Sequence, residues 1–313
     1  MRGLDEAKAL YENYGTAMLH ERFSEYESRI AVGLAGHGSE CFGFDDEISR
    51  DHDFEPGFCM WLSADDDISI GIRLASEYRK MLSEVLSASD TQVNRSAMSE
   101  KKLGVVRTGD FFRRYTGSDS APQSLEHWLS IPSWALAEAT NGQVWRDELG
   151  EFSAIREILL HGMPEDVRRK KIAYCLINMA QSGQYNYPRC VRHGEKASAC
   201  LALTAFVQNC AELIYLLNRA HAPYYKWIFR GMDSLSVLSD MKEPLSFLLL
   251  SDNSDGGIVL KSQIVEDICA NIISILKDQG LTDSGSMYLE EHAYEVRERI
   301  ENQKLQSMHI MEI

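Results

Sequence analysis

Short strand-like segments and long amphipathic stretches divide the chain into two parts. In the first part, segments at residues 30–35, 58–62, 103–108 and 142–147 alternate with longer stretches of mixed polarity. An apolar run of roughly four to eight residues is long enough for a buried strand and too short for a typical helix. From Glu151 onward such segments stop. We therefore expect a small sheet in the first part and helices alone in the second.

Apolar positions that recur every three or four residues predict the helices. The strongest pattern covers residues 201–217, where one face collects Leu203, Phe206, Val207, Cys210, Leu213, Ile214 and Leu217. The same spacing predicts further helices at residues 5–26, 70–86, 264–276 and 288–306, with shorter ones that begin at Ser124 and Ser133. Two polar segments rich in Ser and Asp, residues 87–99 and 117–122, are expected to be loops.

These patterns predict an α+β protein with two domains. Residues 1–150 would form a mixed sheet with flanking helices, and residues 151–313 an all-helical domain. A chain of 313 residues is long enough for two modest domains. Pro56 and Gly57 interrupt the segment that ends at residue 62, so we expect an edge strand there, a bulge, or two separate strands.

The net charge and the composition limit the kinds of molecule that we expect the protein to bind. The chain is 44% hydrophobic and carries a net charge of −15. Such an acidic chain is a poor general binder of nucleic acid, which needs a basic surface, and it suits a small cationic substrate. One basic run, residues 168–171, either faces a triphosphate or lies on a solvated helix start, and we prefer the second interpretation. A homodimer is a further expectation.

The cysteines and the N-terminus indicate a cytoplasmic protein. No apolar run approaches the length of a membrane span, and the first residues are too charged for a signal peptide. The seven cysteines are an odd number without a Cys-x-x-Cys pair. We expect reduced, mostly buried thiols and no zinc site.

The candidate chemistry lies between the first two strand-like segments. The first ends at Gly36-His37-Gly38-Ser39, and Asp51-His52-Asp53 follows a short spacer. A Gly-Ser turn can bring backbone N–H groups and a hydroxyl up to a phosphate. Two carboxylates in an Asp-x-Asp pattern on a strand share one face, and they suit Mg²⁺ that is also bound by substrate phosphates. His37 and His52 flank this site as expected hydrogen-bonding partners.

Gly-Ser, a spacer of this length and Ser-x-Asp-x-Asp together resemble the signature of the DNA-polymerase-β-type nucleotidyltransferase superfamily, over residues 30–62. The layout of an α/β part followed by a helical part resembles the small-molecule nucleotidyltransferases of aminoglycoside and lincosamide resistance. Residues 36–54 and 183–227 resemble an uncharacterised bacterial family assigned to the same fold. The resemblance implies a third acid beside the pair. The candidates are Asp110 and Asp147, because the strand-like segment at 103–108 carries Arg107 where an acid is expected.

Three features of the second part are candidates for the remaining roles. Glu195 precedes the strongest helix and could take a proton from a substrate hydroxyl, or it could simply cap that helix. Lys226 and Arg230 are spaced to lie on one helical face, where they could hold a triphosphate while a neighbouring tyrosine stacks on the base. Residues 181–189 are polar and aromatic, and we expect a loop that lines a cleft.

The predicted activity is Mg²⁺-dependent nucleotidyl transfer. Gly38 and Ser39 would hold the β- and γ-phosphates of a nucleoside triphosphate, ATP by preference, and Asp51 and Asp53 would bind one or two Mg²⁺ ions. A hydroxyl of a small-molecule acceptor would attack the α-phosphate and pyrophosphate would leave. Two alternatives stay open, namely nucleotidylation of a protein or a tRNA end, and a catalytically inactive protein that binds nucleotide.

Overall fold

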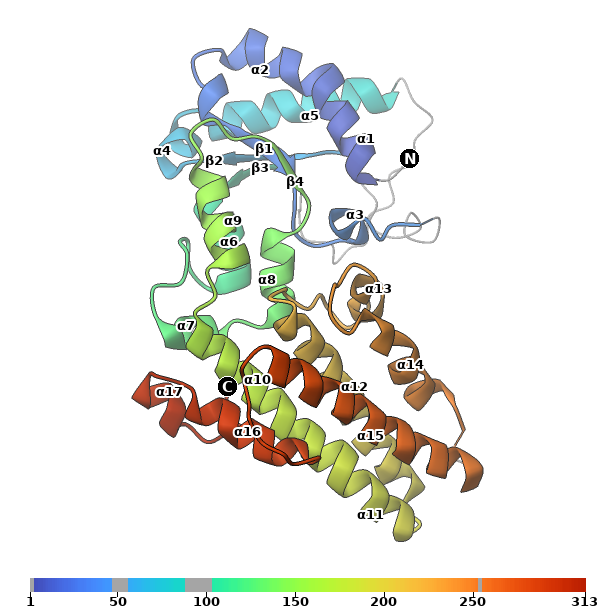
Figure 1. Ribbon diagram of the computed structural model, residues 1–313. Helices are drawn as coiled ribbons and strands as arrows, with labels where there is room; N and C mark the ends of the chain where they lie inside the picture. Colours follow the sequence, from blue (N-terminus) through green and yellow to red (C-terminus); the bar gives the residue numbers. More distant parts are fainter. Residues whose placement is uncertain (1–2, 47–55, 88–102, 253–254) are drawn as a thin grey trace. The chain divides into compact units, whose positions relative to one another are not determined.

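The structure is a computed structural model that describes residues 3–46, 56–87, 103–252 and 255–313. The chain forms two compact units. The first unit comprises Met1–Pro122 and Ala135–Gly162, and the second comprises Gln123–Trp134 and Met163–Ile313. The first unit contains a mixed sheet with helices, and the part of the second unit that is described is helical, so the protein is of mixed α+β class (Figure 1).

The sheet of the first unit has four strands in the order β3-β2-β1-β4. Its strands are β1 (Ala31–Leu34), β2 (Cys59–Leu62), β3 (Gly104–Arg107) and β4 (Gln143–Arg146), at the four predicted segments. β1 pairs antiparallel with β2 and with β4, whereas β2 and β3 are parallel. The expectation of an edge position for β2 is wrong. Pro56 and Gly57 stand before the strand and therefore leave its hydrogen bonds to both neighbours intact.

The strand directions place four chain positions at one end of the sheet. Gly33 in β1 pairs with Cys59 in β2, Cys59 pairs with Gly104 in β3, and Leu34 pairs with Gln143 in β4. The chain therefore leaves β1 at the end where it enters the other three strands. We call this the Leu34 end of the sheet, and the opposite end, where β2 and β3 finish, the Arg107 end.

Alternate side chains of β2 pack into two different cores, as a period of two requires. Met60 and Leu62 pack with α2 (Thr16–Phe23) and α5 (Ile72–Ser87). Trp61 points the other way, and its ring stacks on Phe152 of α9 (Glu151–His161) at 3.9 Å between ring centroids. Figure 1 shows α2 and α5 on one side of the sheet and α6 (Thr108–Thr116), α8 (Ser133–Thr140) and α9 on the other.

The predicted helices of the first unit are present with local irregularities. The segment predicted at 5–26 forms α1 (Gly3–Leu10), the π-helical turn η1 (Tyr11–Gly15) and α2, followed by a 3₁₀ turn, η2 (Glu27–Arg29). The segment predicted at 70–86 forms η4 (Asp67–Gly71) and α5, after the short α4 (Ala64–Asp66). The remaining element, α3 (Ser39–Phe42), follows β1 directly.

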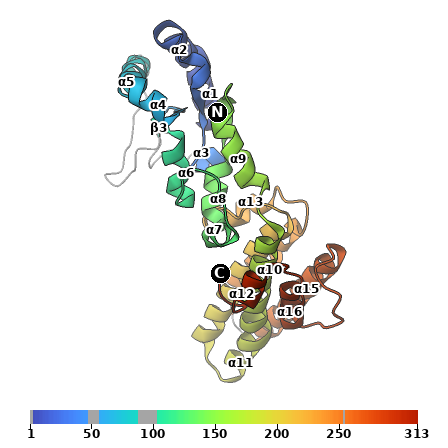
Figure 2. The same cartoon turned by 90° about the vertical axis from the view of Figure 1, so that its left-hand side faces the viewer.

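The second unit is built around α10 (Glu165–Met179) and α12 (Lys196–Leu217), which lie side by side in Figures 1 and 2. The apolar face predicted for 201–217 lies in the core of this unit. The other helices are α7 (Leu125–Ser130), η5 (Ala180–Asn186), α11 (Tyr187–Arg192), α13 (Ile228–Met232), η6 (Ser239–Met241), α14 (Lys242–Leu250), α15 (Asp255–Asp278), α16 (Leu289–Glu298) and α17 (Gln303–Ser307).

The basic run at residues 168–171 does not lie on a solvated helix face, so the preferred interpretation is wrong. Arg168, Lys170 and Lys171 are at most 5% exposed. Each cation of the run donates to a carbonyl of a different segment: Arg168 to Leu216, Arg169 to Arg299, Lys170 to His309 and Lys171 to Ile131. Burial lowers the pKa of Lys170 and Lys171. The run therefore fastens four parts of the second unit to α10.

The single helix predicted at 288–306 is also wrong, because the chain breaks between α16 and α17. The carboxylate of Asp166 accepts hydrogen bonds from the backbone N–H groups of Glu301 and Asn302. The side chain of Asn302 then caps α17 by accepting from Leu305 N. Ile300, between the two helices, is buried. An acid from a distant helix thus holds a turn that the local pattern does not reveal.

One helix of the described residues, α12, is long and apolar enough to cross a membrane by length and composition alone. More than half of its most apolar window is buried inside the second unit, as in a helix of a packed core.

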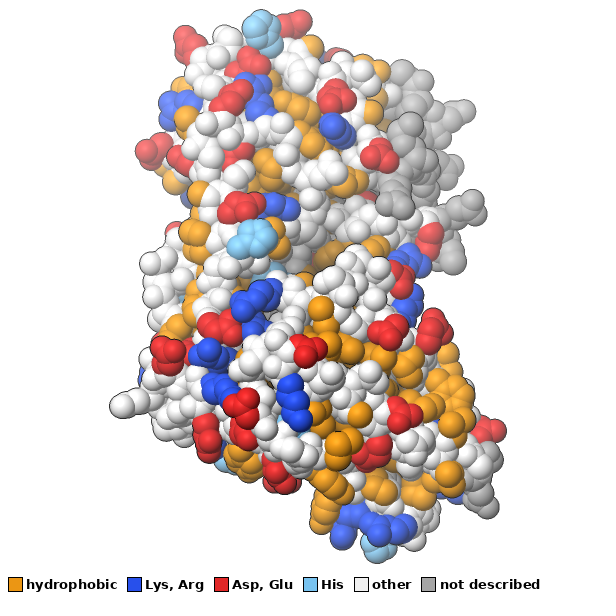
Figure 3. All heavy atoms as spheres, in the orientation of Figure 1, with side chains coloured by type: hydrophobic (Ala, Val, Ile, Leu, Met, Phe, Trp, Pro, Cys, Tyr) orange, Lys and Arg blue, Asp and Glu red, His pale blue; other side chains and the backbone are white. Residues whose placement is uncertain are grey.

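The seven cysteines all lie in the described residues and form no disulfide bond, and five of them are buried. Orange side chains gather over α14 and α15 on the face shown in Figure 3, where the exposed residues include Phe247, Leu249, Leu250, Val259 and Leu260. The homodimer stays a prediction.

Candidate functional site

The Gly-Ser turn follows β1 at the Leu34 end of the sheet. Gly36 and Gly38 have φ angles of +110° and +124°, which side chains other than glycine rarely adopt. A Cβ at Gly36 would also lie 2.6 Å from the hydroxyl of Tyr115. Gly38 precedes α3, and Ser39 is its first residue. The turn therefore has the local geometry that its glycines predict.

Asn141, between α8 and β4, holds this turn through its side chain. Its amide oxygen accepts from Gly36 N, and its amide nitrogen donates to Gly36 O, both at 2.8 Å. The next residue, Gly142, donates its N–H to the carbonyl of Cys41 in α3. A Cβ on Gly142 would meet Leu34 O at 1.9 Å, so this approach needs glycine. Two segments about a hundred residues apart in sequence are thereby fastened together.

Two side chains that the motif did not suggest, Tyr115 and Glu138, contact His37. The backbone N–H of His37 donates to the hydroxyl of Tyr115 in α6, at 3.1 Å. Its ring Nδ1 lies 3.3 Å from the carboxylate of Glu138 in α8. The Glu138 side chain is buried, whereas the imidazole is 81% exposed. Burial and the Glu138 charge raise the pKa of Tyr115, which keeps its hydroxyl neutral.

Sequence reasoning missed Glu138 and Asn141. The available signal was one acid inside the apolar stretch Ala135 to Ala139, which otherwise has the composition of a buried helix. A buried acid needs a partner. The sequence did not show that this partner belongs to the Gly-Ser turn.

The two predicted magnesium ligands, Asp51 and Asp53, lie outside the described residues. Within the ranges that the structure describes, no group of three or more His, Cys, Asp or Glu residues is arranged to hold a metal ion. The magnesium assignment therefore stays a prediction from the sequence.

The candidates for a third acid are engaged elsewhere. The guanidinium of Arg107 binds Asp67, 2.6 Å away, at the Arg107 end of the sheet. Asp110, in the first turn of α6 after this strand end, binds Arg113 at 2.7 Å. Asp147 follows β4 at the same end and accepts from the backbone of Gly150 and Ser153, which positions the start of α9. Asp110 and Asp147 therefore have polar partners of their own at the end of the sheet opposite the Gly-Ser turn.

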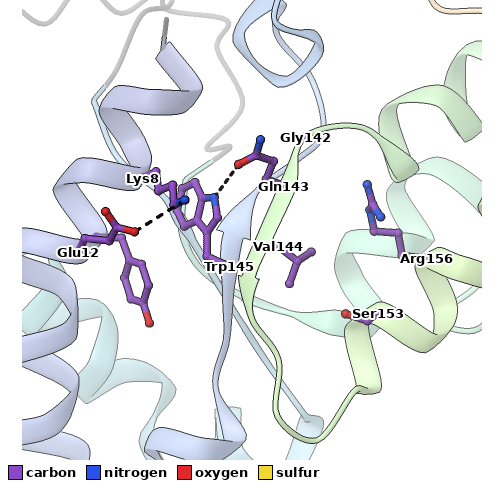
Figure 4. Close-up of a pocket in the computed structure, with 9 residues that line it drawn as sticks. Lys8, Glu12, Gly142, Gln143, Val144, Trp145, Ser153 and Arg156 are labelled. Carbon is purple, nitrogen blue, oxygen red and sulfur yellow. Dashed lines mark hydrogen bonds and ion pairs between the residues drawn. The ribbon is translucent and has the colours of Figure 1, made fainter. Parts of the chain in front are cut away.

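A hollow of about 680 Å³ lies along β4 in the first unit (Figure 4). One of its lining residues is Gly142, which donates its N–H to Cys41 O in α3. Tyr11 stacks on Trp145 at its wall, with 5.8 Å between ring centroids. Its polar lining combines cations, an acid and neutral side chains, namely Lys8, Arg156, Glu12, Gln143 and Ser153. Such a lining suits a polar molecule with several hydroxyl or amino groups.

Glu195 and the pair Lys226–Arg230 lie at opposite ends of α12 in the second unit. Glu195 precedes the first residue of α12 and is exposed, and its side chain makes no capping hydrogen bond. Tyr215, near the last turn, donates its hydroxyl proton to Ile228 O, beside the cationic pair. Twenty residues of helix span about 30 Å. Glu195 therefore cannot share one triphosphate with Lys226 and Arg230.

Lys226 and Arg230 do come together. Both cations lie over the ring of Trp227, 5.0 and 5.1 Å from its centroid. Two exposed tyrosines, Tyr224 and Tyr225, stand beside them with their ring centroids 4.4 Å apart. Trp134 makes an edge contact with Tyr224. We call these six residues the aromatic–cationic surface of the second unit.

The predicted loop at 181–189 is wrong, because η5 and α11 make it helical. Gln184 is buried, donates to Glu266 and to Met287 O, and accepts from Leu289 N. A Cβ on Gly183 would meet the ring of Phe206 at 2.3 Å. The polar residues of this segment thus join helices rather than line a cleft.

Comparison with known families gives a partial match. Residues 128–228 match the model of a family described as a domain of unknown function (DUF4037). The matched range includes Glu138 and Asn141 beside the Gly-Ser turn, and four of the six residues of the aromatic–cationic surface fall near its end, at 224–227. No curated protein matches the chain.

Proposed function

We propose that the protein is a Mg²⁺-dependent nucleotidyltransferase that moves a nucleoside monophosphate from ATP to a hydroxyl group of a small molecule. The observation that carries this proposal is the direction of β1 and β2. β1 runs into the Gly-Ser turn at the Leu34 end, and β2 starts at that same end, six residues after Asp53 in sequence. Nucleotidyl transfer requires a phosphate-binding turn close to a pair of metal-binding acids, and the short stretch of sequence between Asp53 and β2 supports this arrangement.

The proposed roles follow from the chemistry of each group. Backbone N–H groups around Gly38 and the hydroxyl of Ser39 bind the β- and γ-phosphates. Asp51 and Asp53 hold Mg²⁺, which would neutralise charge on the phosphates. The rigid attachment of the turn by Asn141 supports a role in positioning, because an oriented phosphate needs a fixed cradle.

The hollow beside β4 is the proposed acceptor site. It lies in the same unit as the Gly-Ser turn, and one of its lining residues, Gly142, donates a hydrogen bond to Cys41 O in α3. The mixed charge of its lining favours a hydroxylated small molecule over a nucleic acid strand. The aromatic–cationic surface of the second unit is a separate candidate for nucleotide binding, in which Lys226 and Arg230 would contact phosphates and an aromatic ring would stack on the base.

The test measures transfer of label from ATP labelled at the α-phosphate to a panel of hydroxylated small molecules in the presence of Mg²⁺, together with release of pyrophosphate. Asp51→Asn or Asp53→Asn should each abolish release without unfolding the protein. Asp119→Asn is the control, because Asp119 is an exposed acid of the same unit that binds Arg113. Wild-type activity in both Asp51 and Asp53 variants would refute the metal assignment.

Two other outcomes separate the alternative functions. Label that moves from ATP into a protein band would favour protein nucleotidylation. Binding of ATP without pyrophosphate release, over the whole panel, would favour a nucleotide-binding protein without catalysis.

A further inference from the structure

A second hollow, of about 530 Å³, lies within the second unit. Its walls come from the start of α10, the end of α12 and the chain just after α12 and α15. Its polar lining consists of Arg168, Arg169, Arg219, Glu165 and Gln279. A protein with a net charge of −15 thus gathers three arginines around one small space.

The carboxylate of this lining, Glu165, pairs with all three arginines. It accepts from Arg168 Nη2 at 2.7 Å, and it lies 3.0 Å from Arg219 Nη1 and 3.8 Å from Arg169 Nε. Burial raises the pKa of Glu165, but the hydrogen bonds and charges of Arg168 and Arg219 lower it below its ordinary value. Glu165 is therefore ionised at neutral pH. Three guanidinium groups against one carboxylate leave the lining with two positive charges in excess.

Two of the arginines keep N–H groups that the protein does not use. Arg168 is buried and binds Glu165 and a backbone carbonyl. Arg169 binds Asp166, outside the lining, through Nη1, while its Nε is buried and has no hydrogen-bond partner among the described residues. Arg219 is 66% exposed. A guanidinium has five N–H groups and a carboxylate binds two of them at most, so Arg219 retains donors for a ligand.

Arg219 occupies a backbone conformation that favours glycine. Its φ is +53°, one of two positive values at non-glycine residues in the described ranges. It follows the end of α12, where Ala220 N donates to Tyr215 O, and this pattern usually has glycine at the position of Arg219. After α15 the corresponding position is Gly280, with φ of +65°. The arginine therefore strains the backbone, which indicates a role for its guanidinium.

We propose that this hollow binds the phosphate group of a small phosphorylated molecule. A phosphate monoester carries a charge of about −1.5 to −2 at pH 7, which matches the excess charge of the lining. Guanidinium groups bind phosphate oxygens through paired N–H donors. The volume is in the range of small-molecule sites and leaves room for more than a phosphate ion, so the ligand is an ester. The site lies in the second unit and needs no transfer chemistry, so it stands apart from the proposed nucleotidyltransferase function.

Calorimetric titration with glycerol 3-phosphate and with inorganic phosphate tests the site. Constant ionic strength and the absence of Mg²⁺ exclude general salt effects and the proposed ATP site. We expect the wild type to bind both probes, the ester at least as tightly, and to bind acetate more weakly because it has a single charge. Arg219→Gln should weaken binding of the ester by about tenfold or more, since a charged donor is lost. Arg192→Gln is the matched control, because Arg192 is an exposed arginine of the same unit.

Two further variants distinguish a binding site from an ion-pair network that only stabilises the fold. Glu165→Gln should tighten binding of glycerol 3-phosphate by roughly threefold or more, because it removes the negative charge that opposes the ligand. Arg219→Gly should lose binding as Arg219→Gln does. Its melting temperature without ligand should be at or above that of Arg219→Gln, because glycine relieves the strained φ. Loss of binding then cannot come from unfolding.

Three results would overturn the proposal. The first is a wild type that binds neither phosphate compound, or that binds acetate as tightly as the ester. The second is equal weakening in Arg219→Gln and Arg192→Gln, which would indicate a general attraction of anions. The third is weaker binding in Glu165→Gln, which would show that the arginines serve the ion pairs alone. Binding of inorganic phosphate without binding of glycerol 3-phosphate would overturn the assignment of an ester.

Discussion

Two residues at the Gly-Ser turn, Gly36 and Asn141, meet structural requirements that few other residue types could meet. Gly36 needs a positive φ and space against the Tyr115 hydroxyl, and the amide of Asn141 supplies both a donor and an acceptor to its backbone. A turn with this many fixed contacts does not rearrange at low cost. We therefore expect substitutions here to affect folding stability and ATP binding together.

The variants Gly36→Ala and Gly117→Ala distinguish two ways in which an added side chain lowers the free energy of unfolding: a steric clash and a strained backbone conformation. Both glycines have positive φ, but only at Gly36 does a new Cβ meet another atom, the Tyr115 hydroxyl. Gly117→Ala should cost about 1–2 kcal/mol of unfolding free energy from backbone strain alone. Gly36→Ala should cost roughly 1–3 kcal/mol more, from overpacking. Urea unfolding measures both, and equal losses would contradict the contact with Tyr115.

Glu295 predicts a pH dependence of stability. Hydrogen bonds from Thr282 and from the backbone of Asp283 and Ser284, with Arg299 nearby, lower its pKa to about 2. Because this pKa is lower in the folded state than in the unfolded chain, its stabilisation is complete above about pH 5. It should be lost as the pH falls from there toward 2.

Glu295→Gln tests this directly. The melting temperature of the variant should be below that of the wild type at pH 7, and the difference should shrink as the pH approaches 2. A difference that stays constant across this range would show that the carboxylate charge has no part in the stabilisation.

At the scale of elements, the buried cations of α10 hold other segments of the second unit to this helix. Lysine and arginine stems occupy core volume while their charged ends reach carbonyls at the helix ends and turns around them. A hydrogen bond from a charged donor contributes about 1.5–3 kcal/mol, and its loss leaves a carbonyl unsatisfied. The basic run is therefore a structural feature.

Lys170→Ala and Lys170→Met test this role. Lys170 is 0% exposed, and its ammonium lies 2.6 Å from His309 O. The alanine variant loses the hydrogen bond and leaves a cavity, so we expect a loss of about 3 kcal/mol or more. The methionine variant keeps most of the packing and should lose about half as much. Lys277→Ala, at an exposed position, should change the free energy of unfolding by less than about 0.5 kcal/mol. An alanine variant of Lys170 as stable as that control would contradict the account.

Elements with a strong local pattern could be predicted from the sequence, and those set by distant contacts could not. The four strand-like segments and the helix at 201–217 follow from hydrophobic spacing alone. The break between α16 and α17 depends on Asp166, more than a hundred residues away, and the burial of the basic run depends on carbonyls of four other segments. Neither leaves a signal in the local sequence.

At the scale of the whole molecule, an acidic chain is proposed to bind a ligand that is itself strongly anionic. The net charge of −15 opposes a free triphosphate, so we expect the proposed binding to depend on Mg²⁺. The glycines of the turn could be recognised from the sequence. Glu138 and Asn141 could not be assigned to it, because a hundred residues separate them from Gly36.

The measurement that tests the central claim most directly is calorimetric binding of ATP with and without Mg²⁺. The wild type is compared with the Asp51→Asn/Asp53→Asn double variant and with the Asp119→Asn control. The account predicts Mg²⁺-dependent binding by the wild type and the control, and at least a tenfold weaker affinity in the double variant, a difference of about 1.4 kcal/mol. Equal affinity in the double variant, or no binding by the wild type, would contradict it.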